Sequence, residues 1–340
     1  MLQRCAGVTK ACADFRIAQL AGGLGRAAGG CDREQHENSN SRACGAAFGV
    51  PLEILQLIVS GVSQGCVYGL IALGFVLIYK ATEMVNFAQG DIMMLGAYVA
   101  ITFVSLWEWP FLPAALATVA VMAVVGVVLE RVLLRPMIGE PHFAVLMLTI
   151  GLGFVLRALA GAVWGNEPRA LPTPYSGEVL RLGEAVIGYE TLAIILGTAV
   201  LCLAMYLFFR YSRVGIAMQA ASQNQLAAFY VGIPVKRMYA LVWAISAAIA
   251  GVAGMLTAPV SLVDPLIGFV GIKAFAAAIV GGFGSLPGAI IGGLLVGLVE
   301  QFAGRYLPPG FGDTSAYVLL LVMLLIRPQG LFATMQKKKV

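Results

Sequence analysis

Charged residues are scarce in this sequence of 340 residues, and histidine is almost missing. Asp, Glu, Lys and Arg make up 11% of the chain, and the two histidines are His36 and His142. A soluble globular domain carries roughly 25% charged residues, so the composition excludes a water-soluble fold. Neither histidine belongs to a pattern of carboxylates and cysteines typical of metal or hydrolase chemistry. We therefore expect no catalytic residues and no metal site.

The sequence also lacks a nucleotide-binding signature. The phosphate-binding motif G-x-x-x-x-G-K-[ST] is absent, and Gly-Lys does not occur even as a dipeptide. That motif cradles the phosphates of bound nucleotides. The glycines of the run 151–154 fall inside an apolar stretch, which argues against a dinucleotide site. We expect no cofactor bound by this chain and no nucleic-acid partner.

Apolar residues are what the sequence has in abundance: they make up 60% of it, and the mean hydropathy is +0.88. A helix needs about 20 apolar residues to cross a bilayer, and almost every segment after Pro51 provides such a run. The runs lie near 54–79, 84–105, 112–134, 143–164, 191–209, 239–263, 266–284, 286–304 and 316–326. They predict an all-α polytopic membrane bundle over 51–334, with about eight to ten transmembrane or broken helices.

Residues 1–50 differ from the rest because they contain no sustained apolar pattern. Their four cysteines, Cys5, Cys12, Cys31 and Cys44, match no zinc or haem spacing, and the continuous apolar core of a signal peptide is missing. We interpret this segment as a disordered extension. A natural start near Val50 is the alternative interpretation.

Basic residues in the connections predict the orientation in the membrane. The connection 210–237 carries four basic residues and no acidic one, and the tail 335–340 carries three lysines. Lys and Arg in short connections favour the cytoplasmic side, so both segments should be cytoplasmic. The connection 165–190, rich in glutamate and proline, should be the largest external loop.

One stretch, EMVNFAQGDIMMLGAYV at 83–99, places polar side chains inside an apolar region. Asn86, Gln89 and Asp91 should not face lipid, because polar groups in hydrocarbon need partners in protein or water. Gly90 permits a turn, and Asp91 is a candidate N-cap for a helix over 92–104. Two interpretations remain open: a hydrogen-bonded cluster that fixes helix packing, or a helix break beside a transport path.

Two later segments have features of their own. Gly284, Gly288 and Gly292 are spaced four apart, as are Gly293 and Gly297, which predicts close helix packing, with Ser285 and Pro287 starting the helix. Asp264 and Pro265 suggest a turn at the outer surface, and Lys273 should either snorkel or pair with a carboxylate. The stretch 215–230 predicts a short cytoplasmic helix that ends before Gly232 and Pro234.

Four motifs in order resemble one known family. They are GLIALGFVLIYKATEMVNFAQGDIMMLGAYV, SRVGIAMQAASQNQLAAFYVGIPVKRM, KAFAAAIVGGFGSLPGAIIGGLLVGLVE and LLIRPQGLF. Together they cover 52–332 and resemble the LivH-type permeases of branched-chain amino acid ABC transporters. The resemblance implies a membrane subunit that works with a LivM-like second permease, two cytoplasmic ATPases that bind ATP and magnesium, and a periplasmic solute-binding protein. It also suggests the type II importer permease fold.

The same resemblance implies that 211–237 is the segment that couples the permease to an ATPase. The residues concerned are Arg213, Gly215, Gln219, Ala221, Asn224, Ala228 and Gly232. Gln219 departs from the family pattern, in which a basic residue is common, so an ion pair with the ATPase is in doubt there. An ordinary basic loop is the alternative interpretation of this segment.

Three classes of function therefore stay open. The first is an ABC importer permease for branched-chain amino acids, or for related amino acids, short amides or urea. The second is a secondary transporter of small polar solutes, driven by an ion gradient, with an ion site at the polar break. The third, an intramembrane enzyme, is opposed by the lack of a catalytic set.

Overall fold

The computed structural model describes residues 28–137, 139–182, 185–223 and 225–332. The chain divides into two units, Met1–Ile54 and Leu55–Val340. Of the predicted disordered extension, 1–27 lie outside the described residues, and for 28–52 only the helical course of the backbone is described. The predicted basic tail at 335–340 also lies outside them.

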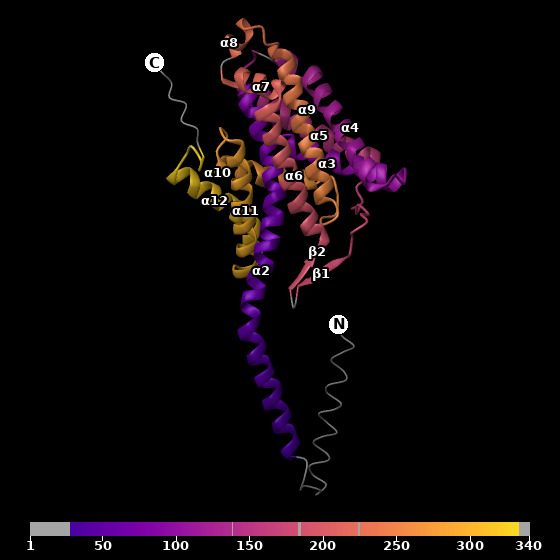
Figure 1. Ribbon diagram of the computed structural model, residues 1–340, viewed down its shortest axis with the longest axis vertical. Coiled ribbons are helices and arrows are strands. Elements are labelled where there is room, and N and C mark those ends of the chain that lie inside the picture. The colour runs from indigo at the N-terminus through magenta and orange to yellow at the C-terminus, as the bar shows by residue number, and fades with distance from the viewer. Residues whose placement is uncertain (1–27, 138, 183–184, 224, 333–340) are drawn as a thin grey trace. The chain divides into compact units, whose positions relative to one another are not determined.

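The second unit is a bundle of helices (Figure 1). In chain order the helices are α2 (Ala28–Thr82), α3 (Gln89–Ile101), α4 (Phe111–Leu129), α5 (His142–Trp164), α6 (Tyr189–Tyr211), α7 (Arg213–Gln223), α8 (Gln225–Tyr230), α9 (Val235–Thr257), α10 (Val270–Gly281), α11 (Leu286–Tyr306) and α12 (Phe311–Ile326). π-Helical turns extend α3 over Thr102–Leu106 and α4 over Glu130–Leu134, and 3₁₀ turns cover Arg135–Met137 and Ile267–Phe269. Strands β1 (Val179–Leu182) and β2 (Ala185–Gly188) form an antiparallel hairpin.

Among the described residues, seven helical segments are long and apolar enough to cross a membrane. They are Glu53–Thr82, Gln89–Leu106, Phe111–Met137, His142–Trp164, Tyr189–Tyr211, Val235–Thr257 and Leu286–Tyr306, and the shorter apolar helices Ile267–Gly281 and Phe311–Ile326 accompany them. The predicted all-α polytopic membrane bundle is thus confirmed. The last predicted span, 316–326, begins earlier than its apolar run, at Phe311.

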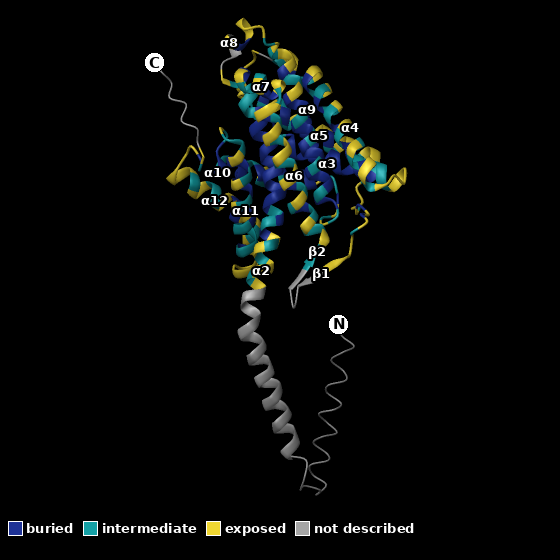
Figure 2. Ribbon diagram, in the orientation of Figure 1, coloured by how far each residue is buried: buried dark blue, intermediate teal, exposed yellow. Residues whose placement is uncertain are grey.

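The most buried membrane segments are those of α2, α3 and α9, and among them α3 and α9 pack against each other inside the bundle (Figure 2). Small residues allow them to approach closely: a Cβ atom on Gly96 of α3 would lie 2.5 Å from the Cα atom of Gly251 in α9. Helices α4 and α6 instead expose large apolar side chains such as Val124 and Leu196. Exposed apolar surface of this kind suits lipid or a partner membrane helix.

Helices α2 and α11 pack through glycines on both sides. A Cβ atom on Gly65 of α2 would lie 2.7 Å from the Cα atom of Leu294, and Gly293 and Gly297 of α11 face Gly69 and Gly65 in return. Close backbone approach through small residues is a recurrent way to associate helices in membranes. The predicted role of Gly293 and Gly297 is confirmed, whereas the matching glycines of α2 were not foreseen.

The prediction that Gly284, Gly288 and Gly292 line one helix face is wrong for Gly284. Ser285 is the N-cap of α11, and its Oγ accepts a hydrogen bond of 3.2 Å from the backbone N–H of Gly288. Gly284 therefore lies in the turn before the helix. Gly288 and Gly292 do pack closely, because Cβ atoms there would lie 2.5 Å from the carbonyl oxygen and 2.6 Å from the nitrogen of Gly281 in α10.

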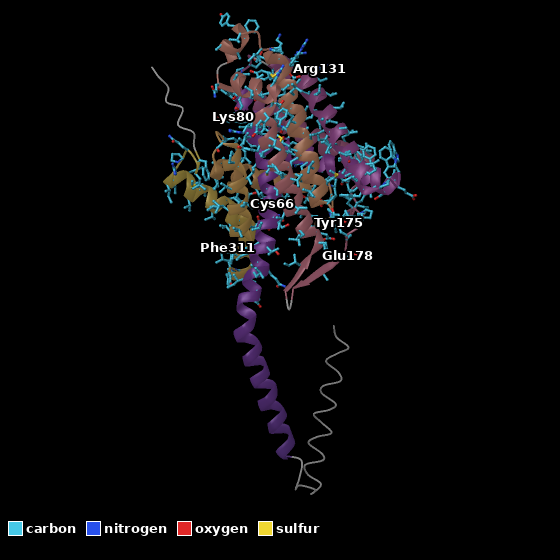
Figure 3. The ribbon with its side chains drawn as sticks, in the orientation of Figure 1. Cys66, Lys80, Arg131, Tyr175, Glu178 and Phe311 are labelled. Carbon is cyan, nitrogen blue, oxygen red and sulfur yellow. The ribbon has the colours of Figure 1, made fainter. Side chains whose placement is uncertain are left out.

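The bundle has two distinct ends. Figure 3 shows Lys80 and Arg131 toward the end that carries α7 and α8, and Tyr175 and Glu178 toward the β1–β2 hairpin. At the hairpin end, backbone hydrogen bonds of 3.0 and 2.8 Å join Arg169 to Val263. The turn at Asp264 therefore lies at the same end as the predicted external loop.

Candidate functional site

The polar stretch in the chain is a true helix break. Helix α2 ends at Thr82, whose Oγ1 donates a hydrogen bond of 2.8 Å to the carbonyl oxygen of Ile78. Glu83 then adopts a positive φ of 57°, and α3 begins only at Gln89. A left-handed backbone is uncommon for a residue other than glycine, so the helix cannot continue through this point. The predicted interruption is confirmed.

The amides of the break are buried and already hydrogen-bonded. Asn86 and Gln89 are 1% and 0% exposed. The Asn86 Nδ2 donates to Gln89 Oε1 at 3.3 Å, and the Asn86 Oδ1 accepts from the backbone N–H of Ala88 at 3.1 Å. Gln89 Nε2 donates to the carbonyl oxygen of Ser246 in α9, again at 3.3 Å. The cluster therefore links the break to α9.

Asp91 forms an ion pair across the bundle with Arg157 of α5. The Nε of Arg157 donates to Asp91 Oδ1 at 2.5 Å, and its Nη2 donates to Oδ2 at 3.3 Å. The Asp91 side chain is 3% exposed and that of Arg157 17%. The guanidinium also lies over the ring of Phe269, 3.8 Å from its centroid. A buried carboxylate is thus neutralised within the protein.

The prediction that Asp91 caps α3 is wrong. The helix starts three residues earlier than predicted, at Gln89, with Ala88 at the cap position and no side-chain cap hydrogen bond. The physical reason is the ion pair: both carboxylate oxygens point toward Arg157 and not toward the free backbone N–H groups of the first turn. Asp91 remains in that first turn, where a negative charge is favoured by the helix dipole.

Glycines line the space that the Asp91 side chain occupies. Added Cβ atoms on Gly153 of α5 and on Gly268 would collide with its carboxylate, and one on Gly90 would lie 2.8 Å from the Cα of Gly271. Gly90 therefore serves close packing within α3 as well as the start of the helix. Neither Gly153 nor Arg157 was expected at the site, although an arginine inside an apolar run was a signal available in the sequence.

A cavity of about 310 Å³ borders the break on one side. Asn86 lines it, whereas Gln89, Gly90 and Asp91 do not. The structure thus brings the four predicted residues together, and among them Asn86 alone lines this cavity.

The predicted coupling segment forms two helices instead of one. Helix α7 starts at Arg213, two residues before the expected beginning, and ends at Gln223, and α8 runs from Gln225 to Tyr230. Asn224 between them lies outside the described residues.

Within α7 the small predicted residues face inward. Gly215 and Ala221 are buried, and a Cβ atom on Gly215 would lie 2.5 Å from the carbonyl oxygen of Phe208. The Gln219 Nε2 donates to the Phe209 carbonyl at 3.4 Å, so this side chain points back to α6.

Helix α8 ends as its sequence predicts. Gly232 has a φ of 89°, its N–H donates to the Phe229 carbonyl at 3.0 Å, and the N–H of Ile233 donates to the Ala228 carbonyl at 3.0 Å. This pair of bonds is the Schellman motif. Ala228 is buried, whereas Phe229 and Tyr230 are 67% and 83% exposed. The segment therefore presents an aromatic tip.

Metal binding and catalysis by a serine nucleophile find no support in the part of the chain that the structure describes. It contains no group of three or more His, Cys, Asp or Glu residues suited to a metal ion. The sequence GVSQG at 61–65 matches the G-x-S-x-G pattern, but Ser63 lies inside the continuous helix α2. A nucleophile elbow needs a strand–turn–helix context, so this match has no catalytic meaning.

A bundle of apolar helices with a buried polar break and an exposed helical segment at one end defines a polytopic membrane protein. The model of the family described as branched-chain amino acid transport system / permease component matches residues 57–327. The chain belongs to this family of transport permeases.

Individual relatives agree with the family match. The high-affinity branched-chain amino acid transport system permease protein LivH of Escherichia coli is 34% identical over 303 residues, covering 85% of this chain and 98% of LivH. The corresponding protein BraD of Pseudomonas aeruginosa is 34% identical over 301 residues, covering 84% and 98%.

One solved structure, PsaBC from Streptococcus pneumoniae in complex with Fab, has a TM-score of 0.47 and 15% identity over 84% of this chain and 96% of that one. That likeness is remote, and the similarity to the type II importer fold stays a prediction.

Proposed function

We propose that this chain is one membrane subunit of an ATP-driven importer that takes up leucine, isoleucine and valine. The observation that carries the proposal is the family match over 57–327, together with 34% identity to LivH and BraD along nearly their whole length. Both relatives are named as permeases of high-affinity branched-chain amino acid transport systems.

The importer would need further subunits, since this sequence contains no phosphate-binding loop. We propose a LivM-like second permease, two cytoplasmic ATPases that bind ATP and magnesium, and a periplasmic solute-binding protein. The solute-binding protein would carry most of the selectivity, and the path would run along the interface between the two permeases.

The ATPase would dock on α7 and α8. Phe229 and Tyr230 form the exposed tip, and aromatic side chains are frequent anchors of protein interfaces. The connection 210–237 contains four basic residues and no acidic one, which favours the cytoplasmic side of the inner membrane. Lys80 and Arg131 lie toward the same end of the bundle (Figure 3).

The break at Asn86–Asp91 would act as a fixed point beside the path. Its amides tie α3 to α9, and the Asp91–Arg157 pair ties α3 to α5. The pairing with Arg157 weighs against an ion-driven mechanism, because a carboxylate already neutralised by a guanidinium is a poor site for a coupling ion.

Reconstitution in liposomes tests the proposal. The four kinds of subunit would be assembled with ATP inside the liposomes, and uptake of labelled leucine from outside would be measured. We expect uptake that requires both ATP and the binding protein, that persists when ionophores collapse ion gradients, and that excess isoleucine and valine inhibit.

Other results would identify different functions. Uptake without ATP that ionophores abolish would contradict an ABC importer. ATP-dependent uptake that unlabelled urea or acetamide inhibits, but isoleucine and valine do not, would keep the importer and change its solute.

A further inference from the structure

The cavity beside the helix break contains one unexplained charged group, Glu130. The cavity is formed by the last turn of α2, the π-helical end of α4, the start of α5 and the start of α9. Its lining residues are Ile78, Thr82, Met84, Val85, Asn86, Glu130, Leu134, Gly139, Val145, Thr149, Tyr239 and Trp243. Most of the lining is apolar, and Glu130 is its only carboxylate.

Glu130 is 2% exposed, and neither of its carboxylate oxygens has a hydrogen-bond partner among the residues that the structure describes. Arg131 and Arg135 are the charged groups that act on it electrostatically, but both are exposed side chains that do not line the cavity. Buried polar groups are nearly always hydrogen-bonded, so an exception calls for an explanation.

The local backbone also marks this position. Glu130 begins the π-helical turn Glu130–Leu134 that follows α4. Single-turn π-bulges inside α-helices occur frequently at functional sites, and here the π-helical turn lies at the C-terminal end of α4. This observation is independent of the missing hydrogen bonds and concerns the same residue.

We propose that the cavity binds a small organic cation, namely a primary ammonium group carried on a short apolar body, with Glu130 as its counter-ion. An ammonium group offers three N–H donors. Two would bind the Glu130 oxygens. The third would bind the hydroxyl oxygen of Thr82 or Thr149. Each of these oxygens accepts one backbone hydrogen bond, from the N–H of Met84 and of Phe87 respectively, and keeps a second lone pair for the ammonium group.

The volume and the lining favour this class over others. A cavity of about 310 Å³ lies at the lower end of the range for small-molecule sites, and Val145, Leu134 and Trp243 would surround an alkyl chain. A bare metal ion would need several oxygen ligands, whereas the cavity supplies one carboxylate. An amino-acid zwitterion would leave its own carboxylate unpaired, because no Lys, Arg or His lines the cavity.

Such a ligand would hold together the elements that lead to the α8 end of the bundle. It would touch α2 just before the break, the end of α4 and the first turns of α5 and α9. The cavity borders the break at Asn86, and the proposal does not depend on which solute is carried.

Isopentylamine is the probe for the test. The full-length chain in lipid nanodiscs would be titrated with isopentylamine by calorimetry, and thermal unfolding would be followed in parallel. We expect saturable binding to the wild-type chain and a Kd weaker by at least about tenfold in Glu130→Gln, since a buried charge would lose its partner. Glu140→Gln, which removes an exposed carboxyl group from the α4–α5 connection, should bind like the wild type.

Val145→Phe gives a second test that leaves the carboxylate in place and fills the cavity; it should also abolish binding. Isopentanol, leucine and potassium chloride should not displace the amine. The proposal is overturned if isopentylamine does not bind, if Glu130→Gln or Val145→Phe binds it as well as the wild type, or if potassium displaces it. An infrared band of a protonated Glu130 carboxyl in the amine-bound protein would also overturn it.

Discussion

At the scale of single residues, two sets of charged side chains inside the bundle form ion pairs, whereas the buried Glu130 has no hydrogen-bond partner among the described residues. Asp91 binds Arg157, and Lys273 binds Glu300 at 2.7 Å and Asp313 at 2.6 Å. Lys273 therefore pairs with carboxylates, one of the two roles expected for it. The two sets differ in exposure, because the side chain of Asp313 is 80% exposed and that of Asp91 is 3% exposed. Their energetic contributions should differ accordingly.

Asp91→Leu should destabilise the chain and prevent transport. The change leaves the Arg157 guanidinium without its partner in a buried site, which costs about 3–5 kcal/mol in comparable buried pairs. Thermal unfolding in detergent and leucine uptake would measure the two effects. Asp313→Asn is the matched control, and its exposed ion pair should contribute less than about 1 kcal/mol.

The double variant Asp91→Leu/Arg157→Leu separates packing from transport. It removes both charges together, so most of the lost stability should return. If uptake returns with it, the pair only fixes helix packing. If the double variant is stable and inactive, the pair has a role in the path. An Asp91→Leu variant with normal stability and normal uptake would show that the break is unimportant.

At the scale of helices, glycine positions decide which elements can touch. The sequence indicated the glycine face of α11, because its glycines recur every four residues. It did not indicate that α2 supplies the opposite face, or that Gly153 of α5 makes room for Asp91. Spacing identifies a face that can pack closely, whereas the partner of that face is set by the fold.

Gly65→Ala and Gly151→Ala should have opposite effects on stability. A Cβ atom on Gly65 would lie 2.9 Å from the carbonyl oxygen of Gly293, so α2 and α11 must separate at a cost of about 1–3 kcal/mol. A Cβ atom on Gly151 of α5 meets nothing within 4 Å. There alanine should stabilise the helix by up to about 1 kcal/mol. Thermal unfolding would measure the change in stability of each variant. Equal changes in the two variants would contradict the close α2–α11 contact.

Tyr230→Ala should weaken ATPase binding without changing the fold. Tyr230 is 83% exposed at the end of α8, and loss of an interface tyrosine costs about 1–2 kcal/mol, or roughly 5–30-fold in affinity. Tyr306→Ala removes a tyrosine that is 65% exposed at the end of α11. Both variants should unfold within about 0.5 kcal/mol of the wild type, and co-purification with the ATPase should fall only for Tyr230→Ala. Equal co-purification would place the docking surface elsewhere.

At the scale of the whole molecule, composition and apolar runs were sufficient to predict a membrane bundle, and the polar residues at 86–91 were sufficient to predict a break. The partners of those polar residues were not predictable. Asp91 had a plausible local role as a helix cap, but Arg157 is 66 residues away in the chain and competes successfully for both oxygens. Local patterns therefore indicate where a helix stops, and long-range contacts determine what its side chains do.

The connection 210–237 and the C-terminal tail, which are both predicted to be cytoplasmic, should lie at the same end of the bundle. The backbone N–H groups of Leu331 and Phe332 donate to the carbonyls of Val280 and Gly281, at 3.0 and 3.1 Å, at the end of α10. Residues Gly284–Pro287, which follow α10 in the chain, line the same cavity as Gln219 of α7. The chain near 330 thus lies at the α7–α8 end, and the hairpin near 176 lies at the opposite end.

Single cysteines would test this orientation in cells. In a variant without the six natural cysteines, Ser176→Cys, Gln223→Cys and Gln329→Cys introduce thiols at exposed positions. The basic connection should remain inside. A thiol reagent that cannot cross the inner membrane should therefore label position 176 in cells with a permeable outer membrane, and it should label 223 and 329 only after the inner membrane is opened. Labelling of 223 and 329 but not 176 in intact cells would mean an inverted permease, and it would rule out α8 as the surface that meets a cytoplasmic ATPase.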